Sequence, residues 1–189
     1  MNNVDLIGDD ACVKQLLTDD FSNTNGVYID DGIDEIGQYA FSYCSNLTSV
    51  DFPATTSIGE SAFRDCSKLT SANFPAVTSI RGSAFSSCSN LTSVDFQAAT
   101  SIGGNAFYNC SNLTSLILRK SDSICTLANT NAFNITPIKS GTGYIYVPRA
   151  LMDTYKAASN WSTYAAQFRA LEDYTVDGTI TGDLDQSKI

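Results

Sequence analysis

The chain has 189 residues, of which 43% are hydrophobic and 16% are charged, so it can form a sizeable core and is not a disordered polypeptide. Its net charge of −9 is concentrated at the ends: residues 1–35 carry nine acidic side chains and one lysine, whereas residues 36–171 carry six acids and nine bases. The weakly basic middle lacks the clustered Lys and Arg of a nucleic-acid-binding surface, and no apolar run approaches the ~20 residues that a membrane-spanning helix needs.

The first 35 residues are predicted to form an N-terminal cap (1–35). Asp10 precedes the segment ACVKQLL and fits the N-cap of a short helix, and Asn25-Gly26 fits a turn before a short strand. No basic segment followed by an apolar one is visible, so either the protein is not exported by the signal-peptide route or a leader has been removed. The acidic cluster within residues 30–35 could ligate calcium, but its spacing does not match a calcium-binding loop, which favours a solvated acidic turn.

One 22-residue block is then repeated, with four copies in succession. The copies begin at Ile36, Ile58, Ile80 and Ile102, and the first reads IGQYAFSYCSNLTSVDFPATTS. Self-similarity at a fixed period of this length is typical of a solenoid, in which each unit buries its apolar face only against its neighbours. We therefore expect residues 36–147 to form a solenoid of 22-residue coils, with a fifth, degenerate copy that begins at Ile124.

Each coil is predicted to combine a short helical or 3₁₀ segment with a short strand. In the second copy, the apolar residues from Ile58 to Leu69 are spaced by +4, +5, +8 and +11, which places them on one face of a helix. Ala72 and Phe74 then alternate with polar residues, as in a strand, and Pro75 ends it. Stacking of the coils is expected to align equivalent side chains in ladders. The predicted ladders are Phe41–Phe63–Phe85–Phe107, Leu47–Leu69–Leu91–Leu113, Ile36–Ile58–Ile80–Ile102 and Cys44–Cys66–Cys88–Cys110.

The cysteine ladder is predicted to consist of buried free thiols. One cysteine per coil gives a line of side chains, whereas zinc needs four ligands around a point. Neighbouring Cα atoms at ~5 Å would lie within disulfide range, but side chains in a ladder point in parallel. Cys12 and Cys125 lie outside the ladder, and their state is left open.

The repeated pattern I-G-x-x-A-F-x-x-C-x-x-L-T-S-V-x-F-P resembles the BspA-like leucine-rich repeat, over roughly residues 33–147. The resemblance implies an α/β solenoid that winds as a right-handed superhelix and is capped at both ends. It also implies a bacterial surface or secreted protein that recognises host protein, matrix or another cell.

The residues after the repeats are predicted to form a C-terminal helical cap (148–172), followed by a flexible, acidic tail (173–189). Residues 143–147 fit a last strand, and Pro148 fits the start of a helix. A second helix would carry an aromatic face that covers the end of the solenoid, although the same side chains could alternatively form a carbohydrate platform. This face consists of Trp161, Tyr164, Ala165, Phe168 and Leu171.

The chain contains no histidine, which excludes Ser-His-Asp and Cys-His catalysis and removes the commonest zinc ligand. It also has no Gly-x-Ser-x-Gly elbow and no phosphate-binding Gly-Lys-Ser/Thr motif. We therefore predict a protein that is not an enzyme and that holds no cofactor and no metal. Arg64, Lys68 and Arg81 form a modest basic patch, for which ordinary solubility is a sufficient explanation.

The candidate binding site is the polar face of the predicted strands. Small hydroxyl and carboxylate groups in rows resemble the extended binding faces of solenoids, although a merely solvated sheet face is the alternative. We predict a noncatalytic binding or adhesion module, monomeric and extracellular or at the cell surface, whose ligand is a protein or glycan and not nucleic acid or a membrane. The alternative function is a structural display domain of a phage or cell-surface assembly. The site residues are Ser49, Asp51, Ser71, Asn73, Ser93, Asp95, Ser115 and Ile117.

Overall fold

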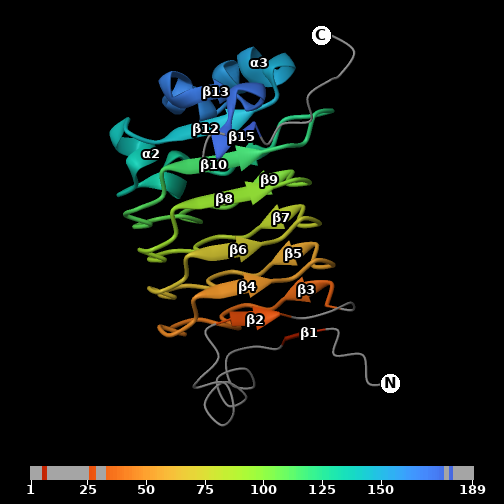
Figure 1. Ribbon diagram of the computed structural model, residues 1–189, viewed down its shortest axis with the longest axis vertical. Coiled ribbons are helices and arrows are strands. Elements are labelled where there is room, and N and C mark those ends of the chain that lie inside the picture. Colours follow the sequence, from red (N-terminus) through yellow and green to blue (C-terminus); the bar gives the residue numbers. More distant parts are fainter. Residues whose placement is uncertain (1–5, 8–25, 29–32, 177–178, 181–189) are drawn as a thin grey trace.

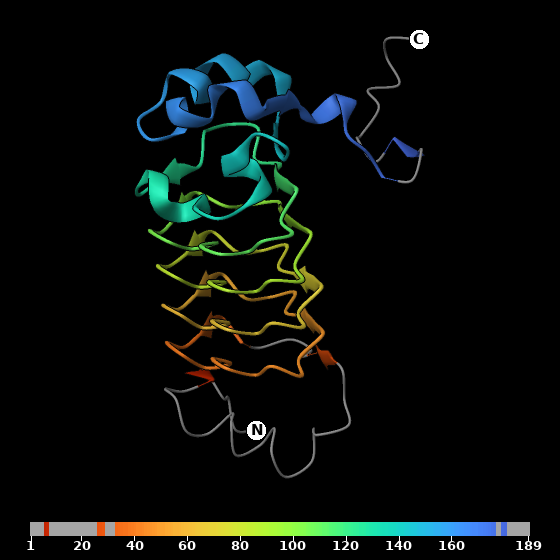
Figure 2. The ribbon, with the colours of Figure 1, turned by 90° about the vertical axis from the view of Figure 1, so that its left-hand side faces the viewer.

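The computed structural model describes residues 6–7, 26–28, 33–176 and 179–180, which form an elongated stack of coils with short helices gathered at the C-terminal end (Figures 1 and 2). The predicted helix after Asp10, the thiol of Cys12 and the first two acids of the cluster, Asp30 and Asp31, lie outside the described residues.

The larger of two parallel sheets runs the length of the stack, with its strands in the order β13-β12-β10-β8-β6-β4-β2. Its repeated strands pair at the period of the sequence repeat, as Ser49 with Ser71 and Ser93 with Ser115 show. The predicted strand of each coil is therefore confirmed, and the chain is a parallel-strand repeat structure. The strands are β2 (Gly26–Tyr28), β4 (Ser49–Asp51), β6 (Ser71–Asn73), β8 (Ser93–Phe96), β10 (Ser115–Leu118), β12 (Tyr144–Val147) and β13 (Phe168–Ala170).

A second parallel sheet of two-residue strands lies on another side of the coils, in the order β1-β3-β5-β7-β9-β11 (Figure 1). Each strand of the repeats ends on the isoleucine that opens a copy, and Ile36, Ile58, Ile80 and Ile102 are at most 1% exposed. The sequence analysis did not predict this sheet. Its strands are β1 (Leu6–Ile7), β3 (Glu35–Ile36), β5 (Ser57–Ile58), β7 (Ser79–Ile80), β9 (Ser101–Ile102) and β11 (Thr126–Leu127).

The helical segment predicted for each regular coil is wrong, because the backbone there forms consecutive turns. The N–H of Ala62 donates within its own coil to the carbonyl of Gly59 (3.3 Å), whereas the N–H of Phe63 donates to the carbonyl of Ala84 in the next coil (2.7 Å). A helix would keep all of these bonds within one coil. Two positions per coil also have positive φ, which no α-helix or 3₁₀-helix contains. They are Tyr39 and Tyr43, Ser61 and Asp65, Ser83 and Ser87, and Asn105 and Asn109. In the fifth coil the equivalent segment does include a 3₁₀-helix, η1 (Thr130–Phe133).

The core contains the predicted phenylalanine, leucine and isoleucine ladders. Phe41, Phe63, Phe85, Phe107 and Phe133 stack in nearly parallel planes, with neighbouring ring centroids 5.1 to 5.6 Å apart. The leucine and isoleucine ladders are buried alongside them. Aromatic stacking at this spacing adds to the free energy of burial, so the ladder fixes each coil against the next.

The ladder cysteines Cys66, Cys88 and Cys110 are free thiols, as predicted. Cys66, Cys88 and Cys110 are fully buried, and each S–H donates to the carbonyl of the phenylalanine that precedes the cysteine of the neighbouring coil. The Sγ–O distances, to Phe41, Phe63 and Phe85, are 3.0, 3.1 and 3.0 Å. Cys125 is also free and buried, whereas Cys44 is half-buried.

The C-terminal segment contains short helices and one further strand. The predicted strand at 143–147 is β12, and Pro148 precedes a helical stretch as expected. The predicted second helix is wrong beyond residue 167, because Phe168 begins β13, which pairs with β12. The helices are α2 (Pro137–Ser140), η2 (Arg149–Leu151), α3 (Met152–Ala157), η3 (Trp161–Gln167) and η4 (Leu171–Asp173); β14 (Thr175–Val176) and β15 (Thr179–Ile180) pair antiparallel.

The aromatic residues of this segment close the end of the core. Trp161, Tyr164 and Phe168 are at most 2% exposed, so the alternative of an exposed carbohydrate platform is wrong. Trp161 and Tyr164 contact Phe133, the last ring of the phenylalanine ladder, at centroid distances of 6.0 and 5.4 Å. The ladder therefore ends against aromatic rings and not against solvent.

Side chains of the same segment also satisfy the backbone groups of the last coil. The N–H of Cys125 donates to the Tyr155 hydroxyl (2.8 Å), and the Cys125 carbonyl accepts from Trp161 Nε1 (2.7 Å). Asn160 Nδ2 donates to the carbonyls of Leu127 and Ala128 at 2.8 and 3.1 Å. These bonds replace the ladder that another coil would otherwise supply to β11.

Candidate functional site

The outer face of the larger sheet carries a continuous row with one side chain from each of its strands β4, β6, β8, β10, β12 and β13. Along each strand, side chains alternate between the core and this face, so Val94 and Leu116 point inward while Asp95 and Ile117 point outward. The strand register aligns the outward residues directly opposite one another. The row consists of Asp51, Asn73, Asp95, Ile117, Tyr146 and Arg169.

A second row on the same face consists of hydroxyl-bearing side chains. Ser49 pairs with Ser71, Ser93 with Ser115, and Ser115 with Tyr144. The structure therefore brings all eight predicted site residues onto one face. Ser71, Asn73 and Ser93 are exposed, and Ser49, Asp51, Asp95 and Ser115 are half-buried.

Ile117 departs from the prediction of an accessible site residue. It is only 3% exposed, although it lies outside the core cluster. Its neighbours in the row, Asp95 and Tyr146, flank it on the outer face. Ile117 therefore supports the surface from below and does not contact a ligand directly.

The two ends of this face differ in chemistry. At the N-terminal end the groups are acidic and amide, and Asn73 Nδ2 donates to Asp51 Oδ1 at 2.8 Å. Further along, Asp95 accepts from Arg119 through both carboxylate oxygens, at distances of 2.7 to 2.9 Å. This bidentate pair raises the pKa of Arg119 above its ordinary value, so its charge is retained.

The C-terminal end of the face is aromatic and basic. The rings of Tyr146 and Tyr174 meet edge to face with their centroids 4.5 Å apart, and Tyr144 lies 6.4 Å from Tyr146. The Arg169 guanidinium lies over the Tyr144 ring, with Cζ 4.2 Å from its centroid. Burial raises the pKa of the Tyr146 and Tyr174 hydroxyls, so both remain neutral donors at physiological pH.

We call Tyr144, Tyr146, Tyr174, Arg119 and Arg169 the tyrosine–arginine patch. The sequence analysis missed it. Alternation in the segment YIYV, with Ile145 and Val147 buried, was the one signal that could have placed both tyrosines on the outer face. Arg169 gave no such signal, because the pattern around it favoured a helix.

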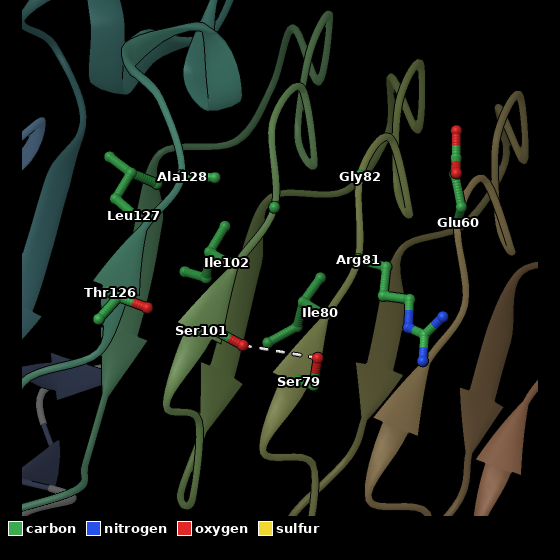
Figure 3. Close-up of a pocket in the computed structure, with 11 residues that line it drawn as sticks. Glu60, Ser79, Ile80, Arg81, Gly82, Ser101, Ile102, Thr126, Leu127 and Ala128 are labelled. Carbon is green, nitrogen blue, oxygen red and sulfur yellow. Dashed lines mark hydrogen bonds between the residues drawn. The ribbon is translucent and has the colours of Figure 1, made fainter.

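A shallow depression of about 390 Å³ lies on the smaller sheet, around β7, β9 and β11 (Figure 3). A row of hydroxyls from Ser79, Ser101 and Thr126 crosses it, with Ser101 Oγ 3.5 Å from Ser79 Oγ. Neighbouring coils pack closely there, since a Cβ at Gly103 would lie 2.5 Å from the nitrogen of Gly82. Small hydroxyls in a shallow depression offer few directed contacts, so this depression is a weaker candidate than the strand face.

The predicted basic patch is partly neutralised by its neighbours. Arg64 pairs with Asp65 at 3.2 Å and Arg81 with Glu35 at 3.6 Å. Lys68 Nζ donates to an asparagine side chain, Asn46 Oδ1, at 3.0 Å. These exposed contacts agree with the interpretation of the patch as an ordinary solvated surface.

Two further kinds of site are absent from the part of the chain that the structure describes. Its Cys, Asp and Glu side chains form no group of three or more that could hold a metal ion. Within the same residues, no helix has the length and apolar character needed to cross a bilayer.

Several solved structures are similar to the chain. A leucine-rich repeat protein of T. pallidum shares 27% identity with a TM-score of 0.55, over 65% of this chain and 57% of that one. The pneumococcal vaccine antigen PcpA matches with 15% identity and a TM-score of 0.55, over 78% of this chain and 40% of that one. A leucine-rich cell surface protein of Faecalibacterium prausnitzii matches with 23% identity and a TM-score of 0.47, over 77% of this chain and 38% of that one. The chain thus spans less than two thirds of the length of each.

No curated protein matches the chain in sequence. The family model described as the BspA type leucine-rich repeat region matches residues 18–141 with six copies. The match begins within the segment predicted as the N-terminal cap, where β2 already pairs with β4 of the first regular coil. It covers about two thirds of the chain, and the strands that it contains recur in register along both sheets. The chain therefore belongs to the BspA-type leucine-rich repeat family.

Proposed function

We propose that the protein is a noncatalytic binding module that recognises a protein or glycan through the outer face of its larger sheet. The observation that carries this proposal is the register-aligned row from Asp51 to Arg169, which displays polar, aromatic and charged groups on six hydrogen-bonded strands. Because the ladders beneath fix each strand, the face can bind without reorganising.

The noncatalytic part of the proposal rests on chemistry. The family is typically noncatalytic, and the chain has no histidine to act as a general base. The buried thiols have pKa values raised by burial, to about 12 for Cys110 and Cys125, which keeps them protonated and poorly nucleophilic.

A binding screen against matrix proteins and glycans tests the function. We expect a specific ligand whose binding is lost in the Asn73→Arg variant, because this exposed side chain belongs to the row and a long cation there would obstruct the face. Glu60→Arg is the matched control: Glu60 is also exposed but lies beside the smaller sheet. Equal loss of binding in both variants, or in neither, would contradict a site on the strand face.

We also propose the division into an N-terminal cap (1–35), a solenoid of four regular 22-residue coils and one degenerate coil (36–147), a C-terminal helical cap (148–172) and a flexible tail (173–189). The pairing of equivalent strand residues in successive copies and the contacts of Trp161 support it. An extracellular or cell-surface location and a monomeric state complete the proposal. Antibody labelling of intact cells and light scattering test these two points.

A further inference from the structure

We propose that the tyrosine–arginine patch is the principal contact of the strand face and that it binds a carboxylate side chain of an acidic polypeptide segment. This inference rests on the binding function proposed above. It goes further by naming the end of the face that binds and the chemistry of its partner.

Arg169 differs from every other arginine of the described residues. Each of the others is paired with a carboxylate, whereas Arg169 takes part in no ion pair with a described residue. The four pairs are Arg64–Asp65, Arg81–Glu35, Arg119–Asp95 and Arg149–Asp173. Because Arg169 is exposed and has no acidic partner among the described residues, a carboxylate from another molecule can reach it.

The Arg169 guanidinium is also held in place. Its Nη1 donates to the carbonyls of Ala166 and Phe168 at 2.9 and 2.8 Å, and its plane is supported by the Tyr144 ring. Nε and Nη2 donate to no described residue. A fixed planar group that retains two donors matches the geometry of a carboxylate, and little side-chain entropy is lost when the bond forms.

The surroundings of Arg169 suit a protein partner. Tyrosine and arginine are among the residue types most enriched in the energetically dominant positions of protein interfaces. Tyr144 and Tyr146 are half-buried on β12, so they are rigid and still accessible, and the half-buried Tyr174 lies beside Tyr146. Arg119 adds a second cation beside them, and Asp95 neutralises one of the two charges, which leaves the patch with a net charge of +1.

The ring geometry favours a polypeptide over a sugar. Stacking of a sugar requires an open, flat aromatic face. One face of Tyr144 is covered by Arg169, and Tyr146 and Tyr174 meet at an interplanar angle of 64°, so neither forms a flat platform with the other. The patch instead offers ring edges and hydroxyls around a cation, which fits an acidic side chain flanked by apolar residues.

Selection from a phage-displayed random heptapeptide library on the folded protein tests the proposal, followed by titration calorimetry of the enriched peptides. We expect the selected peptides to contain Asp or Glu. We expect Arg169→Gln to weaken their binding at least about tenfold. The affinity of Arg169→Lys should lie between those of the wild type and Arg169→Gln, because lysine keeps the charge but loses the planar donors. Arg64→Gln, which removes an exposed arginine away from the strand face, is the matched control and should change affinity less than twofold. Circular dichroism and urea unfolding check that each variant is folded.

The outcomes separate this inference from the function on which it rests. Peptides whose binding is lost in Asn73→Arg but unchanged in Arg169→Gln would leave the strand-face function in place and overturn the patch. Binding unchanged in both variants would overturn both proposals. Selected peptides without acidic residues, or failure of the library to yield any binder, would overturn the acidic polypeptide as partner. A glycan ligand, found on a glycan array, whose binding depends on Arg169 would also overturn the acidic polypeptide as partner.

Discussion

Single residues repeat their contacts from coil to coil, and the phenylalanine ladder is the clearest case. Phe85 is fully buried and stacks on Phe63 at 5.2 Å and on Phe107 at 5.4 Å. Phe85→Ala removes both stacks and leaves a cavity, so we expect a loss of about 3–5 kcal/mol in the free energy of unfolding. Urea denaturation measures it. Phe85→Leu, which fills most of the volume, should cost clearly less; equal costs would show that the stacks contribute nothing specific.

The buried thiols predict a pH dependence of stability. Burial raises the pKa of Cys110 from 9.0 to about 12, so above pH 9 the unfolded chain releases a proton that the folded chain retains. Deprotonation then favours the unfolded state, and stability falls as pH rises from about 9 to about 12, by about 1.4 kcal/mol per pH unit for each such thiol. Below pH 9 both states keep the proton and no dependence arises.

Cys110→Ala isolates this effect. The variant is less stable than the wild type at pH 8, but its disadvantage should shrink by about 1.4 kcal/mol at pH 10, because it lacks the proton release. Urea unfolding of both proteins at the two pH values measures the difference. A constant difference would show that Cys110 titrates alike in the folded and unfolded chains.

At the scale of elements, the turns explain why sequence periodicity predicted a helix. The buried residues Ala62, Phe63 and Cys66 have the spacing of a helix face, and periodicity reports only which residues face the core. The positive φ at Ser61 and Asp65 and the bonds to the next coil are non-local features of the backbone. The two-residue strands of the smaller sheet were missed because alternation needs about four residues to be visible.

The candidate site was predictable only in its repeated part. Ser71, Asn73, Ser93 and Asp95 recur at one offset and were placed on the correct face by alternation. The patch at the C-terminal end depends on β13, which joins the sheet from outside the repeat. No local sequence pattern predicts the pairing of β13 with β12. Arg169 therefore lies beside Tyr146 and Tyr144 only because of the tertiary fold.

The C-terminal segment acts as an element that completes the last coil. The Cys125 N–H is buried, and its acceptor is the Tyr155 hydroxyl. Tyr155→Phe keeps the ring but leaves this donor unpaired, and we expect a loss of about 1–3 kcal/mol. The amide of Cys125 should also exchange faster with deuterium. The control Tyr144→Phe removes a hydroxyl from the outer face and should cost less than about 0.5 kcal/mol. Equal costs would contradict the role of Tyr155 at the end of the stack.

At the scale of the whole molecule, the core of the stack is uniform along its length, whereas the chemistry of the strand face differs between its two ends. The same hydrogen bonds and ladders recur along its length, so its stability is close to a sum of coil and neighbour contributions. The surface is not uniform in the same way, because the acidic and amide groups lie towards one end of the strand face and the tyrosines and arginines towards the other. A repetitive core therefore carries a face whose chemistry changes from end to end.

Removal of one whole coil tests whether the sequence repeat is also the structural unit. Deletion of residues 80–101 joins Ser79 to Ile102, which take the positions of Ser79 and Ile80 in the smaller sheet. We expect this variant to fold with an unchanged type of circular dichroism spectrum, reduced stability and a denaturant m-value lower by about a tenth, because the surface exposed on unfolding shrinks with chain length. Deletion of residues 80–90 is the control: it removes half a coil and puts every later ladder out of register, so it should not fold. Similar behaviour of the two deletions would contradict one coil as the unit, whereas folding of the first alone would show that the register of the ladders, and not the number of residues, holds the stack together.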